Sequence, residues 1–284
     1  MTNSKEFLID KTKCVRCGKC IDVCPEGIIK LSFDKKVIDY INNPEVFCNK
    51  CGHCIAVCKA KAIRVAGVKN NNLISASENR NNCGDIVENL IKNRRSIRKY
   101  KTQKIQSNEI KKLIDTAGFA PSGSNAHHVE WIVYSDDEKI REIARLIVGW
   151  MSSHLKNNSE TLSTRYKEIF NKFINDWKEG RDLILRDAPH FIIAHGPSTG
   201  SIGTLNHVDG HIALDYFELA AIAAGFGTCC IGLFYHAVEN LYQPLLDYLA
   251  LPEGHVCYGA MILGYPKYKY TYIPERKEAK IIYR

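Results

Sequence analysis

The spacing of the cysteines constrains this chain more than any other feature. Eight of the twelve cysteines fall into two runs of the same form, Cys14-x2-Cys17-x2-Cys20-x3-Cys24 and Cys48-x2-Cys51-x2-Cys54-x3-Cys58. The second run begins 34 residues after the first, and Gly18 of the first run repeats as Gly52 of the second. Two copies are too few for a solenoid. The repeat therefore predicts a small domain with two pseudo-symmetric halves.

The form of each run favours iron–sulfur clusters over zinc. A structural zinc site usually takes two close pairs of ligands, whereas each run here has three cysteines at steps of three and a fourth at a step of four. Such a loop holds three sulfurs on one cubane, and we expect the fourth cysteine to begin a helical turn and point to the other cluster. The spacing therefore predicts two [4Fe–4S] clusters, one held by Cys14, Cys17, Cys20 and Cys58, the other by Cys48, Cys51, Cys54 and Cys24.

Over about residues 5–66 the chain resembles the bacterial two-cluster ferredoxins. It departs from their pattern at Lys59, which stands where a proline usually follows the last cysteine. A proline fixes the turn and removes an amide donor, so we expect the change to alter hydrogen bonding near the first cluster without preventing ligation. Apolar alternation at 28–31 and 37–40 predicts short strands between the two runs.

A polar stretch without periodicity follows this region. We expect a ferredoxin-like domain at 1–67, a linker at 68–84 and a second domain at 85–284. In the second domain helical periodicity, with Ser107 as one N-cap, is interrupted by short apolar strands at 131–134, 191–194 and 256–263. Residues 150–187 have a helical pattern of mixed polarity. The alternation predicts an α+β or α/β layer fold.

Three segments of the second domain carry candidate chemistry. Residues 94–100, RRSIRKY, combine basic side chains with a hydroxyl, as an anion cradle does, although a solvated basic face also explains such a run. Residues 120–125, APSGSN, predict a rigid turn. In residues 225–232, GFGTCCIG, the glycines precede an expected strand and the third glycine of a dinucleotide fingerprint is missing, but the segment predicts a close approach of the backbone to a flat or bulky group.

Together with Gly264-Tyr265-Pro266 and Arg276, these segments resemble the nitroreductase family of flavin enzymes over about residues 86–284. The resemblance implies an α+β sandwich that forms a homodimer with FMN at the subunit interface. It departs from the family pattern at His127-His128 and at Cys230, where many relatives have tryptophan. Both differences reshape the expected pocket, and the resemblance transfers no catalytic acid to this chain.

Carried over by position, the resemblance implies roles for individual residues. Arg94 and Ser96 would contact the FMN phosphate region with Arg95 beside them, and Arg276 would be a second phosphate clamp. Arg98 would lie near N1 and O2 of the ring, where a guanidinium stabilises the negative charge of the reduced flavin. From the other subunit the ring would be approached by Pro121, Ser122, Gly123 and Asn125. The backbone of Cys230, Ile231 and Gly232 would point an amide at N5.

Other residues carry weaker expectations. His207 and His211 have the spacing of a metal pair, but with no glutamate between them and no third ligand in view we expect no site there. His127 and His128 are expected to be packed or solvated rather than proton donors. The remaining cysteines, Cys83, Cys229, Cys230 and Cys257, lack ligand spacing and are expected to be small buried residues.

The two halves together predict an iron–sulfur flavoprotein oxidoreductase. Electrons from NAD(P)H or a reduced carrier would pass through two [4Fe–4S] clusters to FMN and then to a small electrophilic acceptor of the nitroaromatic or quinone class. Outward flow from FMN to an external carrier, and a redox sensor or electron carrier, are the alternatives. The net charge of +8 is not accompanied by a nucleic-acid-binding motif. Since no long apolar stretch or leader pattern is present, we expect a cytoplasmic protein without a membrane segment.

Overall fold

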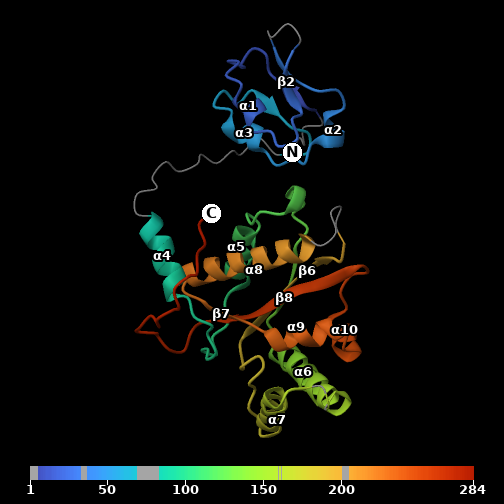
Figure 1. Ribbon diagram of the computed structural model, residues 1–284, viewed down its shortest axis with the longest axis vertical. Coiled ribbons are helices and arrows are strands. Elements are labelled where there is room, and N and C mark those ends of the chain that lie inside the picture. The colour runs from blue at the N-terminus through green and yellow to red at the C-terminus, as the bar shows by residue number, and fades with distance from the viewer. Residues whose placement is uncertain (1–5, 33–36, 69–82, 159, 161, 200–204) are drawn as a thin grey trace. The chain divides into compact units, whose positions relative to one another are not determined.

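The computed structural model describes residues 6–32, 37–68, 83–158, 160, 162–199 and 205–284 (Figure 1). The chain forms two compact units, a small one near the N-terminus and a larger one that holds most of residues 83–284. Most of the expected linker, 69–82, lies outside the described residues. The division at 67 and 85 remains a prediction. In the described part of the chain no helix is both long and apolar enough to cross a membrane.

Short antiparallel strand pairs build the small unit. β1 (Leu8–Ile9) pairs with β4 (Ile63–Arg64), and β2 (Ile29–Leu31) pairs with β3 (Ile38–Tyr40), as the apolar alternation predicts. Three short helices accompany the strands, α1 (Lys19–Asp22), α2 (Pro44–Phe47) and α3 (His53–Val57). Buried isoleucines from both halves of the repeat form the core of this unit.

The helices of the small unit refine one expectation about the cysteine runs, since the fourth cysteine begins a turn of its own, closed by hydrogen bonds from the Gly27 amide to the Cys24 carbonyl at 3.2 Å and from the Lys61 amide to the Cys58 carbonyl at 2.9 Å. The third cysteine of each run lies inside a helix, Cys20 in α1 and Cys54 in α3, whereas the fourth cysteine follows the helix end. Each helix begins directly after a glycine with positive φ, 75° at Gly18 and 73° at Gly52. Glycine adopts this left-handed conformation without the steric cost of a Cβ. The glycine therefore starts the helix early, and the fourth cysteine leaves it.

A four-stranded antiparallel sheet forms the centre of the larger unit. Its order is β5 (Glu130–Tyr134), β6 (His190–Pro197), β8 (His255–Gly264) and β7 (Gly227–Cys230), so β7 lies at an edge. Alternate residues of β6 enter different cores: Phe191 and Ile193 pack on one face, Ile192 and Ala194 on the other. Burial on both faces explains why these central strands are continuous apolar runs in the sequence.

Helices cover both faces of this sheet (Figure 1). On one face α6 (Asp137–Asn157), α9 (Gly232–Glu239) and α10 (Gln243–Leu249) share a core with the sheet, and α7 (Thr164–Lys178) packs against α6. The other face packs against α5 (Ser107–Ala117) and α8 (Leu205–Ala223), while α4 (Cys83–Asn93) contacts α8, and a short 3-10 turn spans Gly123–Asn125. The predicted α+β class and the strand positions are confirmed.

Two local expectations in this unit are wrong. Gln106 rather than Ser107 is the N-cap of α5, and its backbone N–H donates to the Glu109 carboxylate at 3.4 Å. Cys229 and Cys257 are buried as expected, but Cys83 and Cys230 are exposed. Their positions explain this, because Cys83 begins the exposed helix α4 and Cys230 ends the edge strand β7.

The closest approach between α8 and the sheet is made by Gly210. A Cβ at this position would lie 2.4 Å from the Cβ of Tyr258 on β8. We expect Gly210→Ala to lower the free energy of unfolding of the larger unit by about 1–3 kcal/mol, because a packed interface resists an added methyl group. Thermal melts measure the effect. Gly84→Ala is the matched control, since no atom lies within 4 Å of the point that its Cβ would occupy. Equal melting temperatures for both variants would contradict the close packing.

The buried His190 predicts acid sensitivity of the larger unit. Its Nε2 accepts from the Ile105 amide at 2.8 Å and its Nδ1 lies 2.8 Å from Ser135 Oγ. Burial, with a smaller effect of Lys104, lowers the pKa of His190 from 6.5 to about 4. As the pH falls below 6.5, this histidine binds a proton in the unfolded chain but stays neutral in the folded chain. The free energy of unfolding therefore falls, by roughly 2 kcal/mol at pH 5.

Urea unfolding at pH 7 and pH 5 measures this loss. His190→Gln keeps a hydrogen-bond acceptor without a titrating group, so its stability should depend less steeply on pH over the same range. Parallel pH dependences in the wild type and the variant would show that His190 is not responsible.

Candidate cofactor sites

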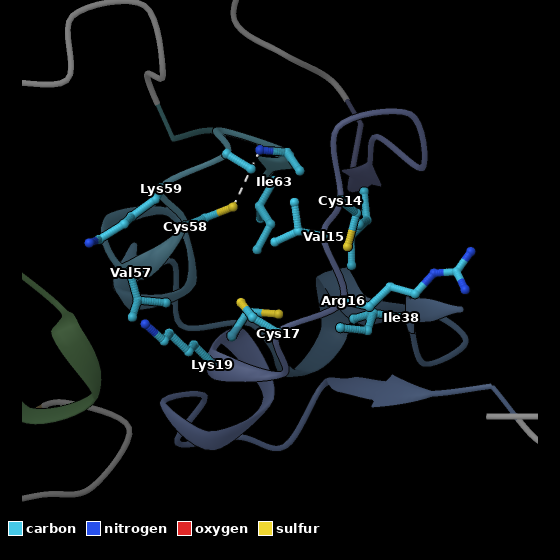
Figure 2. Close-up of a pocket in the computed structure, with 14 residues that line it drawn as sticks. Cys14, Val15, Arg16, Cys17, Lys19, Ile38, Val57, Cys58, Lys59 and Ile63 are labelled. Carbon is cyan, nitrogen blue, oxygen red and sulfur yellow. Dashed lines mark hydrogen bonds between the residues drawn. The ribbon is translucent and has the colours of Figure 1, made fainter. Parts of the chain in front are cut away.

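The eight cysteines of the small unit surround two separate pockets. Four of them line a cavity of about 150 Å³ together with apolar side chains such as Ile9 and Ile63: Cys14, Cys17, Cys20 and Cys58. Figure 2 shows Cys14, Cys17 and Cys58 around this hollow. The other four line the second pocket beside Ile28 and Val65: Cys24, Cys48, Cys51 and Cys54. The structure thus brings together the two crossed sets that the spacing predicts.

The pockets have the chemistry that a cluster requires. Each offers four sulfur atoms against apolar walls, and backbone amides already point at two sulfurs, from Ala62 to Cys58 Sγ at 3.3 Å and from Lys50 to Cys48 Sγ at 3.4 Å. Burial raises the pKa of the Cys54 thiol to about 11. Metal binding requires the thiolate, so cluster assembly would release protons here. The donor sets fit two iron–sulfur cubanes.

The charged side chains around the two pockets differ. Three basic residues line the first pocket, Arg16, Lys19 and Lys59 (Figure 2). The second pocket is lined by Glu26 and His53 instead. Lys59, which replaces the usual proline, therefore adds a cation beside the first pocket. The Cys58 sulfur also receives the Ala62 amide hydrogen bond, so the changed turn still supplies a donor.

In the larger unit the basic segment runs along the free edge of β7. The Ile97 amide donates to the Thr228 carbonyl at 2.8 Å, and Ser96 forms a parallel bridge with Thr228. A Cβ at Gly227 would lie 2.5 Å from Cγ1 of Ile97. The bulky group that the glycine accommodates is therefore this isoleucine of the same chain.

A buried carboxylate on α8 joins this segment to the sheet. Glu218 Oε1 lies 3.4 Å from a guanidinium nitrogen of Arg94 and accepts a hydrogen bond from the Thr228 hydroxyl at 2.9 Å. Buried charges are stable only when they are paired. Glu218 therefore fixes Arg94 at the edge of β7.

The three arginine side chains of the 94–98 segment differ in their hydrogen bonds and in their exposure to solvent. Arg95 donates to the carbonyls of Lys92, Arg94 and Tyr272, and its buried Nε has no recorded partner among the described residues. Arg98 is exposed, and its one recorded hydrogen bond, to the Ser96 carbonyl, is 3.5 Å long. The geometry therefore favours Arg94 and Arg98 over Arg95 as contacts for an anion.

The backbone at the end of β7, which is expected to direct an amide at N5, offers two amides that could do so. The Ile231 amide donates to the Ala260 carbonyl at 3.1 Å, so it is occupied. Cys230 lies opposite Met261 in the alternate, non-hydrogen-bonded position, and its amide points away from β8, to the side along which Ser96 and Ile97 run. Gly232 begins α9, whose first amides have no acceptor within the helix.

The loop at 121–128 is held at the other end of α8. The Gly123 amide donates to the buried Asp209 carboxylate at 2.9 Å, and His128 Nε2 lies 3.7 Å from the same carboxylate. The Ser122 hydroxyl accepts from the His127 amide at 3.0 Å, and Pro121 precedes it. His128 is thus a packed histidine, as expected.

One chain does not bring the two halves of the expected flavin site together. Asp209 and Glu218 are nine residues apart on α8, which corresponds to about 14 Å of helix. Arg276 lies in the exposed C-terminal segment and makes no recorded ion pair within the described part of the chain. The roles of Arg276 and of Asn125 in the 3-10 turn stay predictions.

Sequence reasoning missed Asp209 and Glu218. The signal was present, because both are acidic residues at or inside the strongly apolar stretch 210–224. An acid within an apolar helix needs a buried partner. The partners, at Gly123 and Arg94, are distant in sequence and become evident only in the fold.

Comparisons with known proteins agree with both units. Residues 91–265 match the nitroreductase family model and residues 6–59 match a 4Fe-4S dicluster domain. An NAD(P)H FMN reductase of Bacillus subtilis is 26% identical over 64% of this chain and 66% of its own length, so the match spans slightly less than two thirds of that relative. An uncharacterised ferredoxin of Methanocaldococcus jannaschii is 34% identical over 22% of this chain and 82% of its own.

A solved structure shows the same fold as the larger unit. The nitroreductase with bound FMN from Bacteroides fragilis is 21% identical, covers 69% of this chain and 96% of its own, and superposes with a TM-score of 0.54. The larger unit has a nitroreductase-like fold. The family model matches more than half of the whole chain, so the chain belongs to the nitroreductase family. It carries a dicluster ferredoxin domain ahead of the family domain. Both resemblances drawn from the motifs are confirmed.

The pocket grouping predicts which cluster each cysteine serves. Cys58→Ala should remove about half of the bound iron and sulfide, because it takes one of four sulfurs from the first pocket and none from the second. Metal analysis and paramagnetic resonance of the reduced protein measure the loss. Cys83→Ala, which changes an exposed cysteine outside both pockets, is the control and should retain all of the iron. Loss from the second cluster alone would contradict the crossed grouping.

Proposed function

We propose that this chain is an FMN-dependent oxidoreductase that couples two [4Fe–4S] clusters to a flavin. NAD(P)H or a reduced carrier supplies electrons, and a small electrophilic acceptor of the nitroaromatic or quinone class receives them. The proposal rests on one observation: a single chain holds two pockets of four cysteines and a nitroreductase-family unit with cationic side chains and backbone amides at the outer edge of β7.

The free edge of β7 supports FMN as the bound group. Arg98 presents an exposed guanidinium that stays charged at every physiological pH, which suits an anionic ligand or ring. The amides of Cys230 and Gly232 offer donors without internal acceptors, and Arg94 is held in place by Glu218. When bound, FMN supplies hydride transfer and accepts electrons singly or in pairs. The similar Bacteroides structure contains FMN, and the Bacillus relative is named for FMN and NAD(P)H.

A homodimer is part of the proposal because one chain offers only half of each flavin site. The loop at 121–128 and the segment at 94–98 are anchored nine residues apart on α8, so the loop of a second copy would complete the site. Apolar side chains without cover point to an interface. They are exposed on α4 at Ile86, Val87 and Ile91, and in the C-terminal segment at Tyr272, Ile282 and Tyr283.

The covalent link between the units supports electron exchange. A tether keeps donor and acceptor at a high effective concentration, whatever their individual affinity. We therefore retain 1–67 and 85–284 as the functional domains, with 68–84 as the tether. The basic segment near the flavin would also favour anionic groups of a nicotinamide donor.

Anaerobically purified protein tests the proposal directly. Iron, sulfide and FMN should be present at about eight, eight and one per chain, light scattering should give the mass of a dimer, and NAD(P)H should reduce a nitroaromatic or a quinone. Arg98→Ala should weaken FMN binding about tenfold or more and slow flavin reduction, because a charged hydrogen-bond donor is lost. Its cluster absorption should be unchanged.

Arg165→Ala, which removes an exposed arginine from α7, is the control and should bind FMN like the wild type. Zinc in place of iron, or a protein that takes up no FMN, would refute the proposal. Holoprotein that turns over no acceptor would favour a sensor, and turnover that requires an oxidised protein carrier would favour outward flow.

A further inference from the structure

Three adjacent strands of the larger unit bring two histidines and a glutamate together, and none of the three residues lies on β7. Glu130 begins β5, His195 lies in β6 and His255 begins β8. The Nδ1 atoms of the two histidines are 3.1 Å apart, and one ligand atom from each of the three residues lies within 4.8 Å of the others. His207 and His211, the pair with metal spacing in the sequence, are not part of this group.

An irregularity in the sheet places these side chains on one face. Glu130 pairs directly with His195, so their side chains share a face. Between Ala194 and His195 the register with β8 shifts by one residue, and His195 then lies opposite Cys257 while Pro197 lies opposite His255. A one-residue shift exchanges the faces of a strand. Without it, His195 would face Tyr258 and His255 would lie on the other side of the sheet.

The donor set matches a zinc-type ion. Zinc binds imidazole nitrogens at about 2.0–2.1 Å, so two such ligands near tetrahedral geometry are about 3.1–3.4 Å apart, which the observed 3.1 Å satisfies. Two histidines with one glutamate leave a fourth position for water. Glu130 is exposed and His195 is buried, so the group lies between the sheet interior and solvent.

We infer that Glu130, His195 and His255 form a binding site for one divalent zinc-type metal ion with a position open to water. The ion would join three neighbouring strands where the loop at 121–128 enters the sheet, since Glu130 is two residues after His128. The loop and the site are also in contact through β6, because a Cβ at Gly196 would lie 2.7 Å from the His128 carbonyl oxygen. Metal occupancy would therefore restrain this loop.

Zinc binding to the full-length, cluster-loaded protein tests the site. Under anaerobic conditions, equilibrium dialysis with metal analysis should show one zinc ion per chain in addition to the cluster iron, and Co²⁺ should give a visible ligand-field spectrum at the same stoichiometry. His255→Gln and Glu130→Gln should each weaken zinc binding about tenfold or more, because each removes one of three ligands. Both residues lie near the surface, and circular dichroism checks that the variants fold.

His236→Gln is the matched control. His236 lies 3.7 Å from Glu239 on the exposed face of α9, which offers a histidine and a glutamate without a third ligand among the described residues. Its substitution should leave zinc binding unchanged. Zinc that stays bound with wild-type affinity in His255→Gln and Glu130→Gln would locate the ion elsewhere, at exposed thiols for example, and would overturn the inference. If the protein bound no zinc in addition to its clusters, the contact between the two histidines would be a hydrogen bond only. This result would also overturn the inference. Neither result depends on FMN or on turnover.

Discussion

Two buried carboxylates on α8 hold the segments on which the chemistry of the larger unit depends. Glu218 binds Arg94 and Thr228, and Asp209 binds the Gly123 amide. A buried acid is costly without partners, and removal of one partner leaves a charge uncompensated. The helix therefore fixes both segments, one at each end, against a sheet whose central strands are apolar on both faces. The exposed residues of the site depend on this buried frame.

The cysteine pockets were the most predictable part of the molecule. Their grouping follows from the spacing of two short runs. The local turn of each run brings its first three sulfurs together, and the fourth sulfur of each pocket comes from the other run. The strands and long helices were equally accessible, since their apolar periodicity is strong. What the spacing did not reveal was the helix start at Gly18 and Gly52, which moved the third cysteine rather than the fourth into a helix. That detail depends on backbone conformation at a single residue.

The remaining parts of the site depend on contacts between distant segments. The role of Glu218 required the position of Arg94, 124 residues away in the chain. The group of Glu130, His195 and His255 required a register shift inside a sheet, and no pattern in the sequence indicates where a strand slips by one residue. Exposure of Cys230 followed from its place at the end of an edge strand. Periodicity predicts elements, whereas the pairing of elements decides which side chains meet.

The repeat in the small unit is symmetric in its sulfurs but not in its charges. Three cations line the pocket of Cys14 and Cys58, whereas Glu26 and His53 line the pocket of Cys24 and Cys48. Positive charge favours the more reduced, more negative form of a cluster. With both centres loaded, the pocket that carries Lys59 would therefore hold a single electron at lower energy than its pseudo-symmetric counterpart.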